Sequence, residues 1–136
     1  MADRILHTPL AQPLELTWQA AAQMIDHTNL RPEATPDQIV RLCQEAKEFC
    51  FGAVMVNGCY VEQACGNVRG SEVKVGAVIG FPLGAALTSV KQFETEEVLR
   101  KGAVEIDMVL NVGLLKAGER EQIGRASCRE RVCLAV

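Results

Sequence analysis

The chain has 136 residues, of which 49% are hydrophobic and 4% aromatic, and it carries a net charge of −3 with a pI near 5.4. This length supports one domain with a real core, since a chain of about 150 residues buries roughly two-thirds of its unfolded surface. The acidic balance, without a basic stripe, argues against nucleic acid as a partner. No apolar run has the length of a membrane span, and the first residues lack a signal-peptide pattern. We therefore expect a cytoplasmic protein that binds neither nucleic acid nor membrane.

The cysteines do not form a recognisable framework. The sequence has six, and none of them forms a CxxC pair. Four fall in or near helix-like segments at irregular spacing: Cys43, Cys50, Cys59 and Cys65. Such cysteines are typical of small buried apolar side chains in a reducing compartment, and we expect no zinc site and no disulfide framework.

The amino-terminal segment predicts little regular structure. Residues 1–12 have no periodic pattern and are expected to form a loose arm. Thr17 is placed to cap a short, alanine-rich helix over residues 18–23. We expect Trp18, at the start of this helix, to be a packing anchor.

A short strand is predicted at residues 24–28. Because successive strand side chains point to opposite faces, Asp26 and Thr28 share one face. His27 points the other way, and we expect it to be a packing histidine.

The next helix has the clearest start signal in the chain. Thr35 is a good N-cap, Pro36 suits the first turn, and Gln38 completes a capping box. Apolar residues then recur at helical spacing up to about Cys50. Residues 53–57 follow as a second strand.

A third helix and strand repeat this order. A helix is expected over residues 61–70 and a strand over residues 73–79, with Lys74 on the less apolar face of that strand. The turn-rich residues 80–84 could shape the mouth of a site or form a plain tight turn. Ser89 then begins a second capping-box pattern, which predicts a helix through residue 101.

Residues 102–111 form the most informative stretch. Glu105 and Asp107 lie on one face of the expected strand. The other face is wholly apolar, and we expect helices to cover it: Val104, Ile106, Met108 and Leu110. Residues 113–118 are a loop or a helix start. Strands alternating with helices predict an α/β protein with a parallel sheet and right-handed crossovers. A carboxylate at the carboxyl end of such a strand is where barrel enzymes place their chemistry, which singles out Asp107.

The sequence changes character after Gln122. Residues 123–136 carry three basic residues and one acidic residue, against an acidic balance before them, and resemble a translated sequencing adapter. We expect residues 1–122 to form one unit and residues 123–136 to be a non-native tail; a genuine basic tail is the alternative. Cys128 and Cys133 are therefore left out of the functional argument.

Four short motifs, in this order, resemble the deoxyribose-phosphate aldolase family: residues 25–30 (IDHTNL), 53–57 (AVMVN), 78–84 (VIGFPLG) and 105–109 (EIDMV). The similarity runs from about residue 22 to residue 118. It implies an eight-stranded β/α barrel of the TIM type, which typically needs roughly 250 residues. It also implies cleavage of 2-deoxyribose 5-phosphate to glyceraldehyde 3-phosphate and acetaldehyde through a lysine Schiff base, without a metal or any other cofactor. The chain would then be a partial barrel with the first four parallel strands and their helices.

The resemblance assigns roles to single residues. Asp107 matches the family acid that relays protons at the substrate carbon, and Asp26 is the second expected catalytic acid. Thr28 and Met55 are expected on the substrate side, although many relatives have cysteine where Met55 stands. The alternatives are that Asp107 pairs with Lys74 and that Asp26 serves a strand-end hydrogen bond. We expect Lys74 to pair with Glu105 or Asp107.

The family's Schiff-base lysine and phosphate-binding loops fall in a segment that this chain does not match. No lysine of the matched region fits that motif: Lys47, Lys74, Lys91, Lys101 and Lys116. We therefore expect the chain alone to be inactive, with a small phosphorylated sugar as the parent enzyme's substrate and a homo-oligomer as a possible assembly. The alternatives are another Schiff-base aldolase of the same architecture and a non-catalytic half-barrel that self-associates.

Overall fold

A sheet of four parallel strands organises the computed structural model, which describes residues 16–119. Its strands lie side by side in chain order: β1 (Asp26–Asn29), β2 (Ala53–Val56), β3 (Lys74–Ile79) and β4 (Glu105–Met108). All three strand pairs are parallel. The expected α/β fold with successive parallel strands is confirmed. The expected arm and tail lie outside the described residues.

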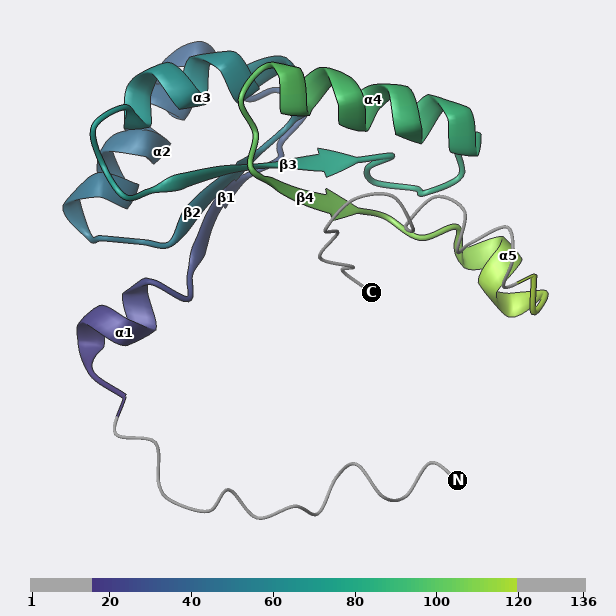
Figure 1. Ribbon diagram of the computed structural model, residues 1–136, viewed down its shortest axis with the longest axis horizontal. Coiled ribbons are helices and arrows are strands. Elements are labelled where there is room, and N and C mark those ends of the chain that lie inside the picture. The colour runs from purple at the N-terminus through teal and green to yellow at the C-terminus, as the bar shows by residue number, and fades with distance from the viewer. Residues whose placement is uncertain (1–15, 120–136) are drawn as a thin grey trace.

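Three helices cover one face of this sheet (Figure 1). They are α2 (Pro36–Glu48), α3 (Val61–Val68), preceded by the 3₁₀ turn η1 (Gly58–Tyr60), and α4 (Thr88–Arg100). Two shorter helices, α1 (Trp18–Ala22) and α5 (Val112–Lys116), lie beyond opposite ends of the strands (Figure 1). Within residues 16–119, no helix covers the other face, so the sheet has one packed face and one open face.

Side-chain caps fix the starts of three helices. Thr17 Oγ1 accepts a hydrogen bond from Ala20 N, as expected for the cap of α1. Thr35 and Gln38 form the predicted capping box of α2. Asn111 Oδ1 caps α5 by accepting from Leu114 N, which selects the helix start among the two predictions for this segment. Each such cap contributes about 1 kcal/mol.

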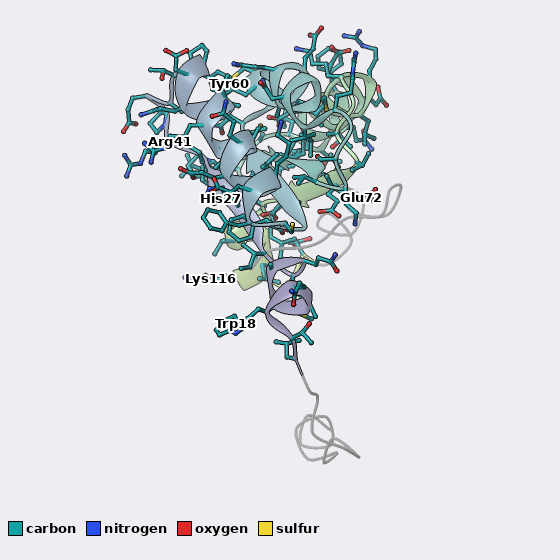
Figure 2. The ribbon with its side chains drawn as sticks, turned by 90° about the vertical axis from the view of Figure 1, so that its left-hand side faces the viewer. Trp18, His27, Arg41, Tyr60, Glu72 and Lys116 are labelled. Carbon is teal, nitrogen blue, oxygen red and sulfur yellow. The ribbon has the colours of Figure 1, made fainter. Side chains whose placement is uncertain are left out.

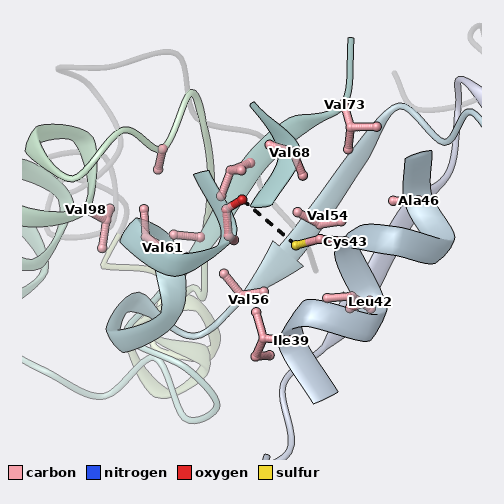
Figure 3. Close-up of a cluster of buried hydrophobic side chains, with 14 of the residues drawn as sticks. Ile39, Leu42, Cys43, Ala46, Val54, Val56, Val61, Val68, Val73 and Val98 are labelled. Carbon is pink, nitrogen blue, oxygen red and sulfur yellow. Dashed lines mark hydrogen bonds between the residues drawn. The ribbon is translucent and has the colours of Figure 1, made fainter. Parts of the chain in front are cut away.

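The core lies between the packed face of the sheet and helices α2 and α3 (Figure 3). Its largest fully buried side chains come from four elements, α2, β2, α3 and β3: Ile39, Cys43, Val54, Val56, Val61 and Ile79. The Cys43 thiol is 3.9 Å from the Ala64 carbonyl oxygen, the weak hydrogen bond drawn in Figure 3. Burying a Val or Ile side chain contributes about 1.5–3 kcal/mol, so these contacts are the main stabilising interaction between the sheet and helices α2 and α3.

Three expectations about packing are wrong. Trp18 is 89% exposed and projects from α1, a helix with no buried residue, so it anchors nothing among the described residues (Figure 2). Cys50 and Cys59 are exposed, and only Cys43 of the four described cysteines is buried. Val104 is 65% exposed because it precedes β4 and lies outside the layer that α3 and α4 cover.

Element boundaries differ from the prediction at several ends. The first strand begins at Asp26, because Met24 and Ile25 still hydrogen-bond back to the end of α1. The strand predicted over residues 102–111 is regular only from Glu105 to Met108. Ser89 does not cap α4: the helix starts at Thr88, and its N-cap, Leu87, makes no side-chain hydrogen bond.

Candidate active site

The register of the sheet brings the predicted site residues to its open face. Thr28 is paired with Met55 and Met55 with Gly76, while Val78 is paired with Asp107. The neighbours of Asp107 in sequence, Ile106 and Met108, are buried in the core with the helices. Because side chains alternate along a strand, Asp107 points to the open face, as predicted.

One lysine and three acids share this open face: Lys74, Asp26, Glu105 and Asp107. Lys74 Nζ donates to Glu105 Oε1 at 2.8 Å, which selects Glu105 among the two acids expected to pair with this lysine. Partial desolvation raises the pKa of Asp26, and the negative charges of Glu105 and Asp107 raise it further, while Lys74 lowers it. The register of the sheet places these side chains of β1, β3 and β4 in one region of the open face.

Asp107 has a buried oxygen that needs a donor. Its Oδ1 is the buried side-chain polar atom without a hydrogen-bond partner among the described residues. A buried carboxylate oxygen without a donor is costly, and such atoms are few in native structures. Asp107 therefore has an acceptor oxygen available on the open face.

Thr28 and Met55 lie on the same face but differ in what they offer. The Thr28 hydroxyl donates to the Asp26 carbonyl oxygen at 2.7 Å, so its hydrogen is used within β1. Met55 is buried and lies over Gly76, where an added Cβ would be 2.5 Å from the Met55 methyl carbon. Gly76 thus leaves room for the Met55 side chain to lie flat across the sheet.

His27 lies on the other side of β1, as predicted for a packing histidine. Its Nε2 is 2.8 Å from Glu45 Oε2, and its ring lies 5.2 Å from that of Phe51. Arg41 contacts the same carboxylate, and His27 and Arg41 lie on the α2 side in Figure 2. The two partners hold the pKa of Glu45 below its ordinary value. His27 is therefore not part of the open face.

Sequence reasoning missed a buried lysine beside the site. Lys91 is only 4% exposed, and its Nζ donates to the Val109 carbonyl oxygen at 2.7 Å, just beyond the carboxyl end of β4. A signal was present, because Lys91, Thr95 and Val98 follow helical spacing and form the buried stripe of α4. Burial lowers the pKa of this lysine, while the charge of Glu94 opposes that shift.

Two cavities in the described part lie away from Asp107. One, of about 480 Å³, is lined at the amino ends of the strands by residues such as Gln23, Gly52 and Lys74. The other, of about 470 Å³, lies between the carboxyl end of β1 and α2 and includes Arg31. Among residues 16–119, no three His, Cys, Asp or Glu side chains gather as a metal site would require. Nor is any helix in that range long and apolar enough to cross a membrane.

Curated relatives match most of this chain. A deoxyribose-phosphate aldolase from Clostridium kluyveri is 53% identical over 102 residues, which are 75% of this chain and 47% of that protein. The enzyme of the same name from Halalkalibacterium halodurans is 51% identical over 108 residues, covering 79% and 48% of the two chains. This chain belongs to the deoxyribose-phosphate aldolase family. It spans about half the length of the curated relatives it matches, and no family model matches it.

Solved aldolase structures share the fold. A putative deoxyribose-phosphate aldolase from Coccidioides immitis superposes with a TM-score of 0.80 at 34% identity, covering 87% of this chain and 49% of that one. A tetrameric deoxyribose-phosphate aldolase from Aeropyrum pernix gives a TM-score of 0.71 at 28% identity, covering 87% and 53%. The four strands and their helices therefore correspond to part of an aldolase β/α barrel, as predicted.

Proposed function

We propose that this chain supplies the first half of a deoxyribose-phosphate aldolase barrel, with Asp107 as its proton-relay acid. The parent enzyme would cleave 2-deoxyribose 5-phosphate into glyceraldehyde 3-phosphate and acetaldehyde. The observation that carries the proposal is the buried Oδ1 of Asp107, which has no donor and lies on the open face of the sheet. The matched part of the chain is 53% and 51% identical to two named aldolases.

The charges of the open face fit the role proposed for Asp107. A Schiff-base lysine must be neutral when it attacks, and forming and breaking the imine requires proton transfers at the substrate carbon. A carboxylate that can pass a proton through a water suits those steps. Lys74, by contrast, is held by Glu105, so we propose that it organises charge on this face and is not the nucleophile.

Asp26, Thr28 and Met55 have supporting roles in this proposal. Asp26 faces Glu105 and Asp107, and its raised pKa makes it a second group able to exchange protons on this face. Thr28 and Met55 form the adjoining surface on β1 and β2, where we propose that the substrate lies. The nucleophilic lysine and the phosphate site would come from the remaining half of the barrel.

The test compares the chain alone with a completed barrel. The completed barrel is a fusion of residues 16–119 to the part of the Clostridium kluyveri relative that lies beyond the match. We expect the fusion to release acetaldehyde from 2-deoxyribose 5-phosphate and borohydride to trap the substrate on a lysine of the added half. The 136-residue chain alone should do neither. An inactive but folded fusion, or trapping on a lysine of the chain alone, would contradict the proposal.

We also propose an oligomeric assembly, a cytoplasmic location and a foreign origin for the tail. The Aeropyrum pernix structure is described as tetrameric, which supports a homo-oligomer for the completed enzyme. The free thiols of Cys43 and Cys65 suit the reducing cytoplasm. We propose residues 123–136 as foreign sequence on the pattern described above.

A further inference from the structure

The loop between β3 and α4 lies against Val109 and Leu110, which follow β4 two and three residues after Asp107. This loop (residues 80–84) leaves β3 at the sheet end where β4 also ends (Figure 1). Gly84 lies so close to β4 that an added Cβ would be 2.0 Å from the Leu110 carbonyl oxygen. The loop therefore lies directly on the residues that follow β4.

Two side chains of α4 hold the loop and the end of β4 in place through hydrogen bonds to their backbones. Lys91 donates from Nζ to the Val109 carbonyl oxygen at 2.7 Å, and its stem packs against Gly80, where an added Cβ would be 2.8 Å from Cε. Glu94 Oε2, one helical turn further on, accepts from Gly80 N at 2.8 Å. One helix face thus holds the first residue of the loop and the end of β4 together.

Stability alone does not explain the buried Lys91 ammonium and its hydrogen bond to the Val109 carbonyl oxygen. A buried cation costs free energy unless it is well paired, and a methionine of similar length would fill the same space without that cost. The Lys91 ammonium instead satisfies a carbonyl two residues from Asp107. The buried ammonium lowers the stability of the fold, but its hydrogen bond fixes the position of the carboxyl end of β4.

We propose that Lys91 and Glu94 are positioning residues that hold the loop at residues 80–84 and the carboxyl end of β4 in one fixed geometry, so that Asp107 is aligned for proton transfer. This inference rests on the proposed aldolase function. Because displacement of a reacting group by about 1 Å can cost on the order of 100-fold in rate, loss of the contact should lower kcat more than it changes KM.

The test replaces Lys91 by methionine in the completed barrel and uses Lys47 as a matched control. Lys47 also donates to a backbone carbonyl, that of Asn67 at 2.9 Å, but it is exposed and joins α2 to α3. We expect Lys91→Met to lower kcat at least tenfold with KM changed less than threefold. Amide hydrogen exchange at residues 80–84 should accelerate at least tenfold, while exchange in β2 stays unchanged. Lys47→Met should leave both quantities within twofold of the parent.

A second variant guards against a folding defect. Glu94→Ala removes the acceptor of Gly80 N at a half-buried position, and we expect it to reproduce the faster loop exchange and the lower kcat. A folded variant of either kind with parental kcat, or with parental loop exchange, would overturn the inference. An inactive parent fusion would instead refute the aldolase proposal, because loop exchange can be measured without activity.

Discussion

Replacing Gly84 by alanine should separate the loop at residues 80–84 from β4, and the size of the effect follows from the geometry. Gly84 has φ +65°, a left-handed conformation that costs an L-residue about 1–2 kcal/mol. An added Cβ would also be 2.0 Å from the Leu110 oxygen and 2.9 Å from the Val109 oxygen. Both neighbours are backbone atoms and cannot move aside alone. Overpacking of this kind adds about 1–3 kcal/mol, so we expect a total loss of about 2–5 kcal/mol.

Gly70 provides the matched control for that substitution. Its φ is +79°, but an added Cβ would meet nothing within 4 Å. Gly70→Ala should therefore cost only the backbone term of about 1–2 kcal/mol. Urea unfolding of the two variants, followed by circular dichroism, measures the difference. Equal unfolding midpoints would refute the close approach of the loop to the end of β4.

The remaining predictions concern a cap, a titration and the tail. Thr35→Ala should lower the free energy of unfolding by about 1 kcal/mol through loss of the capping box, whereas Ser89→Ala should change it by less than about 0.5 kcal/mol; the reverse order in thermal melts would contradict the helix starts described above. Asp26→Asn should stabilise the chain at pH 7: because the folded pKa of Asp26 lies above its ordinary 3.8, the folded chain binds more protons across that interval, and stability falls as pH rises through it. The gain should disappear well below pH 3.8, and a variant less stable than the parent at pH 7 would contradict the converging acids. Rereading the coding DNA across the codon for Gln122 should show an open frame that departs from residues 123–136; an unchanged frame would show that the tail is genuine.

The sequence was sufficient for the order of elements and the direction of their faces. Period-two alternation placed Asp107 opposite Ile106 and Met108, and period 3.6 placed the buried stripe of α2. Both patterns are local, so they do not depend on which elements become neighbours. The pairing of Lys74 with Glu105 was predicted only as one of two possibilities, because the choice depends on the register between β3 and β4.

What the sequence could not determine depends on contacts between distant segments. Trp18 has the composition of an anchor, but its exposure depends on what packs against α1. Ser89 has the right local pattern for a cap, yet the N-cap of α4 is Leu87, two residues earlier. In this helix Lys91 and Glu94 reach Val109 and Gly80. The buried Oδ1 of Asp107 is likewise visible only once the sheet is assembled.

We expect Asp107 to transfer protons in the barrel that this chain helps to form. Steady-state release of acetaldehyde by the completed barrel carrying Asp107→Asn, with Glu105→Gln measured beside it, tests this role. We expect kcat to fall by about 10²–10⁴ for Asp107→Asn, the range typical of a lost general acid–base, and by less than tenfold for Glu105→Gln. A folded Asp107→Asn barrel whose kcat stays within twofold of the parent would contradict it.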